Sequence, residues 1–149
     1  MSLFYFLFII LAAVAAAKLE IQIEGKDGWA KNLPTWKISN RLTKLLLGNY
    51  PFTGYHFWVI IVVLIFLHFP FFLGLVWNIK YELEVIAVVL LTAVLEDFLW
   101  FVLNPAFRIK KFNKNNVPWH GAWLGPVPLV YILFIFATIF LLSISYLFL

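Results

Sequence analysis

Four apolar stretches, each close to 20 residues long, divide this chain of 149 residues and constrain its fold more than any other feature. In hydrocarbon, backbone polar groups must be bonded within the chain, so stretches of this length span a membrane as helices. Hydrophobic residues make up 64% of the chain and charged residues 12%, against roughly 45–50% and about 25% in soluble domains. We therefore predict an all-α integral membrane protein: a single domain over residues 1–149, built as a four-transmembrane-helix bundle with spans at about 3–23, 55–77, 83–103 and 129–149.

The first span carries a second interpretation. Its Ala-rich end, before Lys18, resembles the cleavage region of a signal peptide, but no basic residue precedes the apolar run. We therefore expect the segment to be retained, with its helix continuing through Ile23. At the end of the third span, Asn104-Pro105 should stop the helix, because a residue before proline is pushed out of the α region.

The basic residues predict an orientation. Ten of the eleven Lys and Arg residues lie between spans one and two or between spans three and four. They are Lys18, Lys26, Lys31, Lys37, Arg41 and Lys44, followed by Arg108, Lys110, Lys111 and Lys114. Under the positive-inside rule both basic loops are cytoplasmic and both termini outside, and we expect the cell membrane of a prokaryote. The pI of 9.4 then reflects topology and contact with the lipid bilayer, so no nucleic-acid partner is expected.

The first basic loop predicts an interfacial amphipathic helix over about 34–47. Pro34 suits the first helical turn, and Trp36 and Leu42 fall on one side. Lys37, Arg41 and Lys44 follow one another on another side, where cations meet lipid phosphates. The helix is then a membrane-surface anchor, or a lid in which Arg41 or Lys37 also binds an anionic headgroup.

Two carboxylates inside the third span are the strongest functional signal. An ionised Glu96 or Asp97 in hydrocarbon costs roughly 2.5–3.5 kcal/mol or more, so each needs a compensating partner, proton, ion or water-filled cavity. Glu96 shares a four-residue stripe with Thr92, Trp100 and Asn104, which predicts that this face points into the bundle. We predict Glu96 and Asp97 as catalytic residues, and Trp100 and Asn104 as ligand-binding residues. A structural alternative is a protonated Glu96 between helices, or one paired with an arginine.

Three histidines are candidate proton partners for these acids. Counting about 1.5 Å per helical residue places His68 within about one turn of Glu96 in depth. His56 and His120 belong nearer the cytoplasmic surface, so a polar funnel from His120 and His56 to His68 is predicted. Each histidine also has a structural interpretation; His68, for example, could donate to a carbonyl freed by the kink at Pro70.

Further polar residues could join this site. Glu20 and Glu24 lie four residues apart if the first helix continues past Lys18, and would add an acidic edge to the same mouth. Carboxylates and histidines suit zinc, iron or manganese in a chain without cysteine, but no HExxH-type spacing is present, so metal and cofactor use stay open. Trp29 and Trp119 either belong to interfacial aromatic belts or cover a ligand pocket.

Two classes of function follow. The first is a small intramembrane enzyme or binding protein for an apolar or lipid-like ligand that enters from the cytoplasmic leaflet and meets a buried carboxylate and histidine acid–base site. The second is a proton- or ion-coupled carrier working as a homo-oligomer, or an accessory subunit whose buried acid meets a membrane partner. Walker, dinucleotide-binding and nucleophile-elbow motifs are absent from the sequence.

Overall fold

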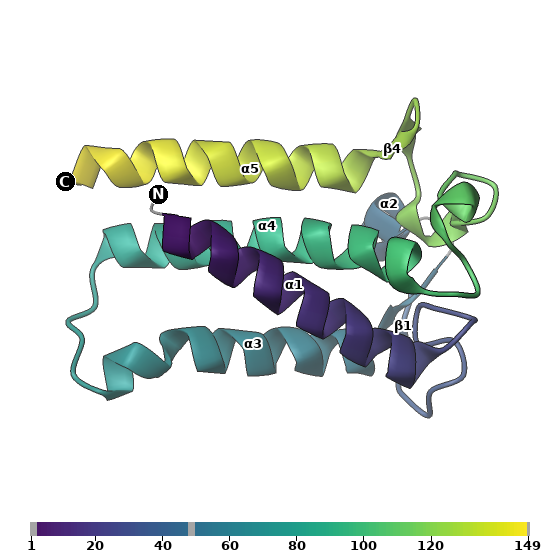
Figure 1. Cartoon of the computed structure of the whole chain (residues 1–149), viewed down its shortest axis with the longest axis horizontal. Coiled ribbons are helices and arrows are strands. Elements are labelled where there is room, and N and C mark those ends of the chain that lie inside the picture. The colour runs from purple at the N-terminus through teal and green to yellow at the C-terminus, as the bar shows by residue number, and fades with distance from the viewer. Residues whose placement is uncertain (1–2, 48–49, 149) are drawn as a thin grey trace.

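Four long helices dominate the computed structural model, which describes residues 3–47 and 50–148 (Figure 1). They are α1 (Leu3–Glu24), α3 (Gly54–Phe72), α4 (Ile79–Leu103) and α5 (Leu129–Ser145). The short elements are β1 (Lys37–Ile38), α2 (Arg41–Leu47), β2 (Phe52–Thr53), β3 (Trp123–Leu124), β4 (Val127–Pro128) and 3₁₀ turns at Ile109–Lys111, Pro118–His120 and Tyr146–Phe148. Leu149, the last residue of the predicted fourth span, lies outside the described residues.

The long helices run side by side, with α1 crossing α4 obliquely (Figure 1). Both termini lie at one end of the molecule. The opposite end, which we call the loop end, is formed by residues 25–47, 50–53 and 104–128 and carries most of the basic residues. Three helices, α1, α3 and α4, are long and apolar enough to cross a membrane, while α5 is apolar but shorter at 17 residues. This architecture supports the predicted all-α membrane class.

Local sequence explains where the helices begin and end. α1 contains neither Gly nor Pro and ends before Gly25, whose φ of 66° lies in the left-handed region that glycine tolerates. The side chain of Asn78 caps α4 by accepting from the amide of Tyr81, and Pro105 follows the other end of α4. α1 and α4 thus both end at the loop end, shortly after their acidic residues.

Several helix boundaries differ from the predicted ones. α4 begins at Ile79 rather than near residue 83, because Asn78 caps it there. α3 ends at Phe72 rather than near residue 77, because Pro70 occupies its last turn and Gly74 adopts a φ of 100°. The predicted helix over 34–47 starts only at Arg41, since Lys37 and Ile38 pair in an antiparallel ladder with Thr53 and Phe52. Lys37 is therefore not on the same helix as Arg41 and Lys44.

The start of α2 has a clear side-chain cause. The Asn40 side chain accepts from the amide of Thr43 at 2.9 Å, and the Thr43 hydroxyl accepts from the amide of Asn40 at 2.8 Å. This reciprocal pair satisfies the orphan amides of a helix that begins at Arg41. It favours the short helix over one that starts at Pro34.

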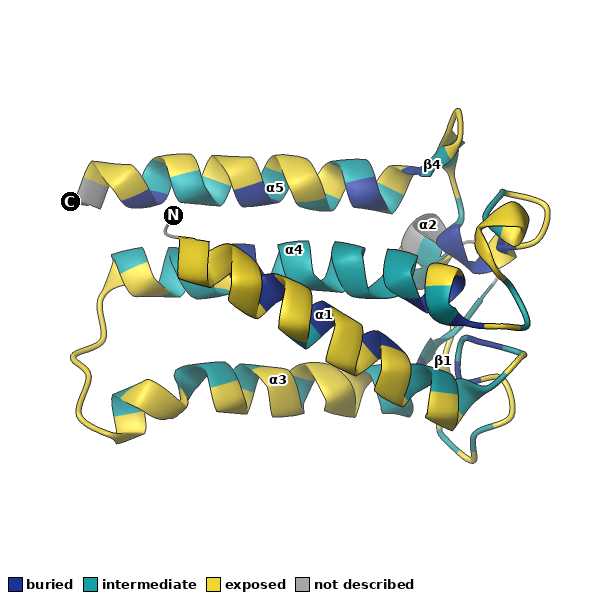
Figure 2. Cartoon of the chain, in the orientation of Figure 1, coloured by how far each residue is buried: buried dark blue, intermediate teal, exposed yellow. Residues whose placement is uncertain are grey.

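The packed core lies at the loop end. Ala17, Trp100, Phe101, Val117 and Trp119 form a buried cluster that joins α1, α4 and the second loop. Along the helices, α4 packs between α1 and α5. By contrast, Gly54 is the only buried residue of α3 within the described chain, and the rest of that helix is exposed or half-buried (Figure 2).

Asn104 ties the ends of α1 and α4 together. It is 2% exposed, its Nδ2 donates to the carbonyl of Gly25 at 2.9 Å, and its Oδ1 accepts from the amide of Ala106 at 3.0 Å. Asn104→Ala should lower the free energy of unfolding by about 1–3 kcal/mol, because it leaves the part-buried carbonyl of Gly25 and amide of Ala106 without their side-chain partner. Thermal unfolding in detergent measures this loss.

The control for that substitution is Asn115→Ala, at an exposed loop position, which should stay within about 0.5 kcal/mol of the parent. Equal unfolding curves for the two variants would show that Asn104 does not hold the helix ends together.

Candidate functional site

A cavity of about 340 Å³ opens among the four long helices near the loop end. This volume lies in the range of ligand pockets, about 300–1,000 Å³. Its walls are mostly apolar, from residues such as Val59, Ile60, Ala93 and Phe134. The polar and aromatic lining residues are Glu20 and Glu24 of α1, Trp29, His56 of α3, Glu96, Asp97 and Trp100 of α4, Trp119, His120, and Tyr131 of α5.

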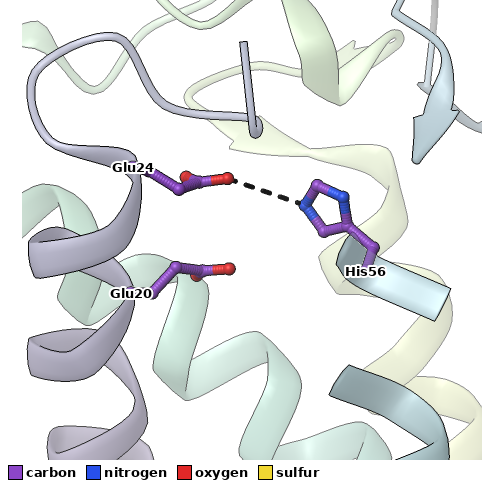
Figure 3. Close-up of side chains that lie close together, drawn as sticks. All are labelled: Glu20, Glu24 and His56. Atoms are coloured by element: carbon purple, nitrogen blue, oxygen red, sulfur yellow. Dashed lines mark ion pairs between the residues drawn. The ribbon is translucent and has the colours of Figure 1, made fainter. Parts of the chain in front are cut away.

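The first polar group combines Glu20, Glu24 and His56 (Figure 3). The two glutamates project from successive turns of α1 towards the imidazole at the start of α3. One ligand atom from each residue lies within 4.8 Å of the other two, and Glu24 Oε1 is 3.9 Å from His56 Nε2. The Glu24 side chain is 4% exposed.

The His56 ring is held from two further sides. Its Nδ1 is 2.6 Å from the hydroxyl of Thr53, and its face stacks on Trp29 with ring centroids 4.3 Å apart. Trp29 is anchored in turn by its Nε1, which donates to the carbonyl of Pro51 at 2.8 Å. His56 Nε2 therefore keeps a fixed direction towards Glu24.

The loop after α1 wraps over this group in a strained conformation. Trp29 and Ala30 have φ values of 51° and 49°, which are costly for residues with a Cβ atom, and the amide of Ala30 donates to Glu24 Oε1. Gly28 is needed in this turn because a Cβ there would lie 3.1 Å from Trp100. The loop thus adopts a strained backbone conformation that fixes the positions of Glu24 and Trp29.

The second polar group is centred on Asp97. Its Oδ2 accepts a hydrogen bond from the hydroxyl of Tyr131 and lies 3.0 Å from Nε2 of His120. His120 is 6% exposed and is surrounded by the rings of Phe101, Phe112 and Tyr131. Two proton-bearing side chains therefore converge on one carboxylate oxygen in an apolar wall.

Glu96 lines the cavity together with Glu20 of the first group. Neighbouring carboxyl groups in an apolar cavity need a proton or a cation to offset their repulsion. Glu96 Oε1 is nevertheless buried without a hydrogen-bond partner in the described chain, as are the Oγ1 of Thr92 and the Nε1 of Trp100. These three residues form the polar stripe predicted from the sequence.

The charge of the cavity is one-sided. Four carboxyl groups line it, those of Glu20, Glu24, Glu96 and Asp97, and among the described residues neither lysine nor arginine does so. Like charges in a space of this size destabilise one another strongly where water is scarce. Protons, histidines or a bound cation must supply the balancing charge.

An apolar groove of about 430 Å³ adjoins the cavity between α1, α4 and α5. Phe6, Ile10, Leu95 and Phe98 are among its walls, and Val94 and Tyr131 line the groove as well as the cavity. Tyr131 thus presents its hydroxyl to Asp97 and its ring to the groove. Val94 and Tyr131 thus form a wall shared by a polar and an apolar space.

Most of the residues predicted from sequence meet at this cavity. Glu96, Asp97, His56, His120, Trp100, Trp29 and Trp119 all line it. His68, Asn104 and Arg41 do not. Asn104 is occupied by the backbone groups described above, and Arg41 is exposed on α2.

His68 belongs to a separate group near the termini. Its Nδ1 donates to the carbonyl of Leu64 at 2.7 Å, and its Nε2 lies 3.3 Å from Glu82. Glu82 also accepts from Nε1 of Trp77 at 2.8 Å. The structure thus corrects the predicted funnel, because His68 joins the far ends of α3 and α4 instead of meeting Glu96 and Asp97.

Tyr131 was not predicted as part of the site, and Glu20 and Glu24 were expected only as an acidic edge at its mouth. Glu20 and Glu24 carried a signal in their four-residue spacing, which gives one face to both carboxylates. Tyr131 offered none, because a tyrosine at the start of an apolar span is also typical of an interfacial belt. Its role depends on the packing of α5 against α4.

No known family model, curated protein or solved structure matches this chain.

Proposed function

We propose that this protein is an intramembrane enzyme that acts on an amphipathic, lipid-like substrate by general acid–base chemistry. The observation that supports the proposal is a pair of adjoining spaces that share Tyr131 as a lining residue: a polar cavity with carboxylates and histidines, and an apolar groove. An acyl or isoprenoid chain suits the groove, and a polar head suits the cavity. A purely apolar ligand would leave the buried polar atoms of Glu96 and Trp100 unpartnered.

The proposed setting is a membrane crossed by all four long helices. At about 1.5 Å per residue, the 17 residues of α5 cover about 25 Å, and its terminal 3₁₀ turn extends this towards the hydrocarbon thickness of about 30 Å. The basic loop end faces the cytoplasm in this proposal, with both termini outside. The substrate then enters from the cytoplasmic leaflet.

In the proposed chemistry, Asp97 is the general base or acid. The hydroxyl of Tyr131 and the imidazole of His120 contact the same oxygen of Asp97, so they orient the carboxylate and stabilise its charge. Glu96 and Glu20 share a proton or a cation beside it. Two carboxyl groups with different surroundings serve acid and base roles, as general acid–base catalysis requires.

Filling the cavity tests whether it binds the substrate. Ala93 lies in its wall, and Ala93→Trp should weaken binding of a single-chain amphiphile at least about tenfold because the indole occupies the space. Suitable probes are brominated fatty acids, alcohols and lysophospholipids, whose chains quench the cavity tryptophans. Fluorescence titration of the protein in nanodiscs measures the dissociation constant.

The matched control is Val62→Trp, at a position 49% exposed on α3 and outside the cavity lining. It should leave the dissociation constant unchanged. If both variants bind the probes as the parent does, or if the parent binds none of them, the proposed amphiphile site is wrong.

A second candidate function rests on α3. Apart from Gly54, no described residue of this apolar helix is buried, so the helix has a free surface for another membrane protein or a second copy. A carrier assembled as an oligomer, or an accessory subunit, would use this surface. A molar mass of more than one chain in detergent, abolished by a bulky substitution on the outer side of α3 such as Val62→Trp, would favour this function.

A further inference from the structure

The geometry points to a divalent metal site formed by Glu20, Glu24 and His56, of the kind that takes Mn²⁺, Fe²⁺ or Zn²⁺. The three side chains bring two carboxylates and one imidazole to one point between α1 and α3 (Figure 3). Carboxylate oxygens and an imidazole nitrogen, without a cysteine sulfur, are ligands of hard to intermediate character, and they suit these ions.

The distances fit a shared ion better than direct contacts. Glu24 Oε1 and His56 Nε2 are 3.9 Å apart, which is too long for a hydrogen bond. Two ligand atoms that each bind one metal ion at about 2.0–2.2 Å lie roughly 3–4 Å apart. The third ligand atom, from Glu20, lies within 4.8 Å of both, so a small side-chain rotation completes the set.

The surroundings of His56 match those of a metal-binding histidine. When Nδ1 carries the proton and donates to Thr53 Oγ1 at 2.6 Å, the lone pair of Nε2 faces Glu24. A hydrogen bond of this kind fixes the tautomer and orientation of ligating histidines. Trp29 covers the ring face and limits its rotation.

Unsatisfied polar atoms in the same cavity point independently to a polar occupant. Trp100 is 3% exposed, yet its Nε1 has no hydrogen-bond partner in the described chain. Glu96 Oε1 is likewise buried without a hydrogen-bond partner in the described chain. Glu96 lines the same cavity but lies outside the group of three ligand residues, so water bound to the ion would be the partner for these polar atoms.

The metal site adds to the proposed function. The chemical role of the ion rests on that function, but metal binding itself does not. A bound cation offsets the charge of the four lining carboxylates and can polarise a substrate oxygen near Asp97. Metal uptake itself is measured without any substrate. The two proposals can therefore fail separately.

The test is metal uptake by the purified, full-length protein in detergent after treatment with a chelator. The parent should retain about one equivalent of Zn²⁺ or Mn²⁺ per chain after desalting, measured by elemental analysis. Glu24→Gln and His56→Ala should each weaken binding by at least about 100-fold, since removal of a ligand exceeds the 10–100-fold cost of losing an outer partner. Thr53→Val should lose about 10–100-fold, and Thr53→Ser, which keeps the hydroxyl, should retain parental affinity.

The chain contains its own matched control. His68→Ala removes a histidine that also faces a glutamate, but at the other end of the helices, and it should bind metal as the parent does. If a cavity variant does not fold, pulsed paramagnetic resonance of Mn²⁺ or Cu²⁺ bound to the parent should show nitrogen coupling from one imidazole. Absence of stoichiometric uptake, or uptake unaffected by Glu24→Gln and His56→Ala, overturns the metal site. If Ala93→Trp still blocks amphiphile binding in that case, the proposed function stands without it.

Discussion

Asp97→Asn is expected to lower turnover of an amphiphile that binds the cavity by about 10²–10⁴-fold, the usual contribution of a positioned acid or base. The substitution keeps the size of the side chain, and an amide oxygen can still accept from the hydroxyl of Tyr131. It removes the charge and the capacity to take a proton. Product formation measured by mass spectrometry, at saturating substrate, isolates this loss from any change in binding.

Glu82→Gln is the control for that experiment. It also replaces a carboxylate of α4 that lies at 3.3 Å from a histidine, but outside the cavity. It should leave turnover within about twofold of the parent, because it touches no group in the cavity. If Asp97→Asn turned over the substrate as fast as the parent, Asp97 would have no catalytic role, and the carrier or accessory-subunit function would be favoured.

The helical architecture could be predicted from the sequence because hydrocarbon leaves few alternatives for long apolar stretches. The ends of these stretches were harder to predict. The segment around Lys37 and Ile38 is extended because it pairs with residues 52–53, a contact that depends on how the chain returns after α2. The pairing of Asn40 and Thr43, which starts α2, is a local signal that the sequence does contain.

The candidate site was predictable along one helix and less so between helices. The four-residue spacing of Thr92, Glu96 and Trp100 correctly placed them on a common face, and all three carry buried polar atoms. The predicted depth of His68 was wrong, because the depths of His68 and Glu96 were each counted from the loop end of a different helix. The short connection of residues 73–78 brings His68 level with Glu82 instead.

Side-chain convergence needs tertiary packing and could not be read from the sequence. His120 reaches Asp97 from a turn more than 20 positions along the chain, and Tyr131 reaches it from α5. Glu20 and Glu24 were recognised as one acidic edge, but their meeting with His56 depends on α1 crossing the bundle (Figure 1). The residues of the site are thus supplied by four helices and two loops.

Phe101→Ala is expected to lower the free energy of unfolding by about 3–5 kcal/mol, the usual cost of truncating a buried aromatic side chain. Phe101 is fully buried, stacks on Trp119 with ring centroids 6.0 Å apart and contacts Phe107, Phe112 and His120. Denaturant unfolding in detergent, compared with Phe66→Ala at a position 73% exposed, measures the loss. Phe66→Ala should change the free energy of unfolding by less than about 1 kcal/mol, because the exposed ring of Phe66 meets mainly lipid or detergent in the folded protein. Equal losses would mean that the loop-end aromatic cluster does not hold the cavity wall, and His120 would then need another support beside Asp97.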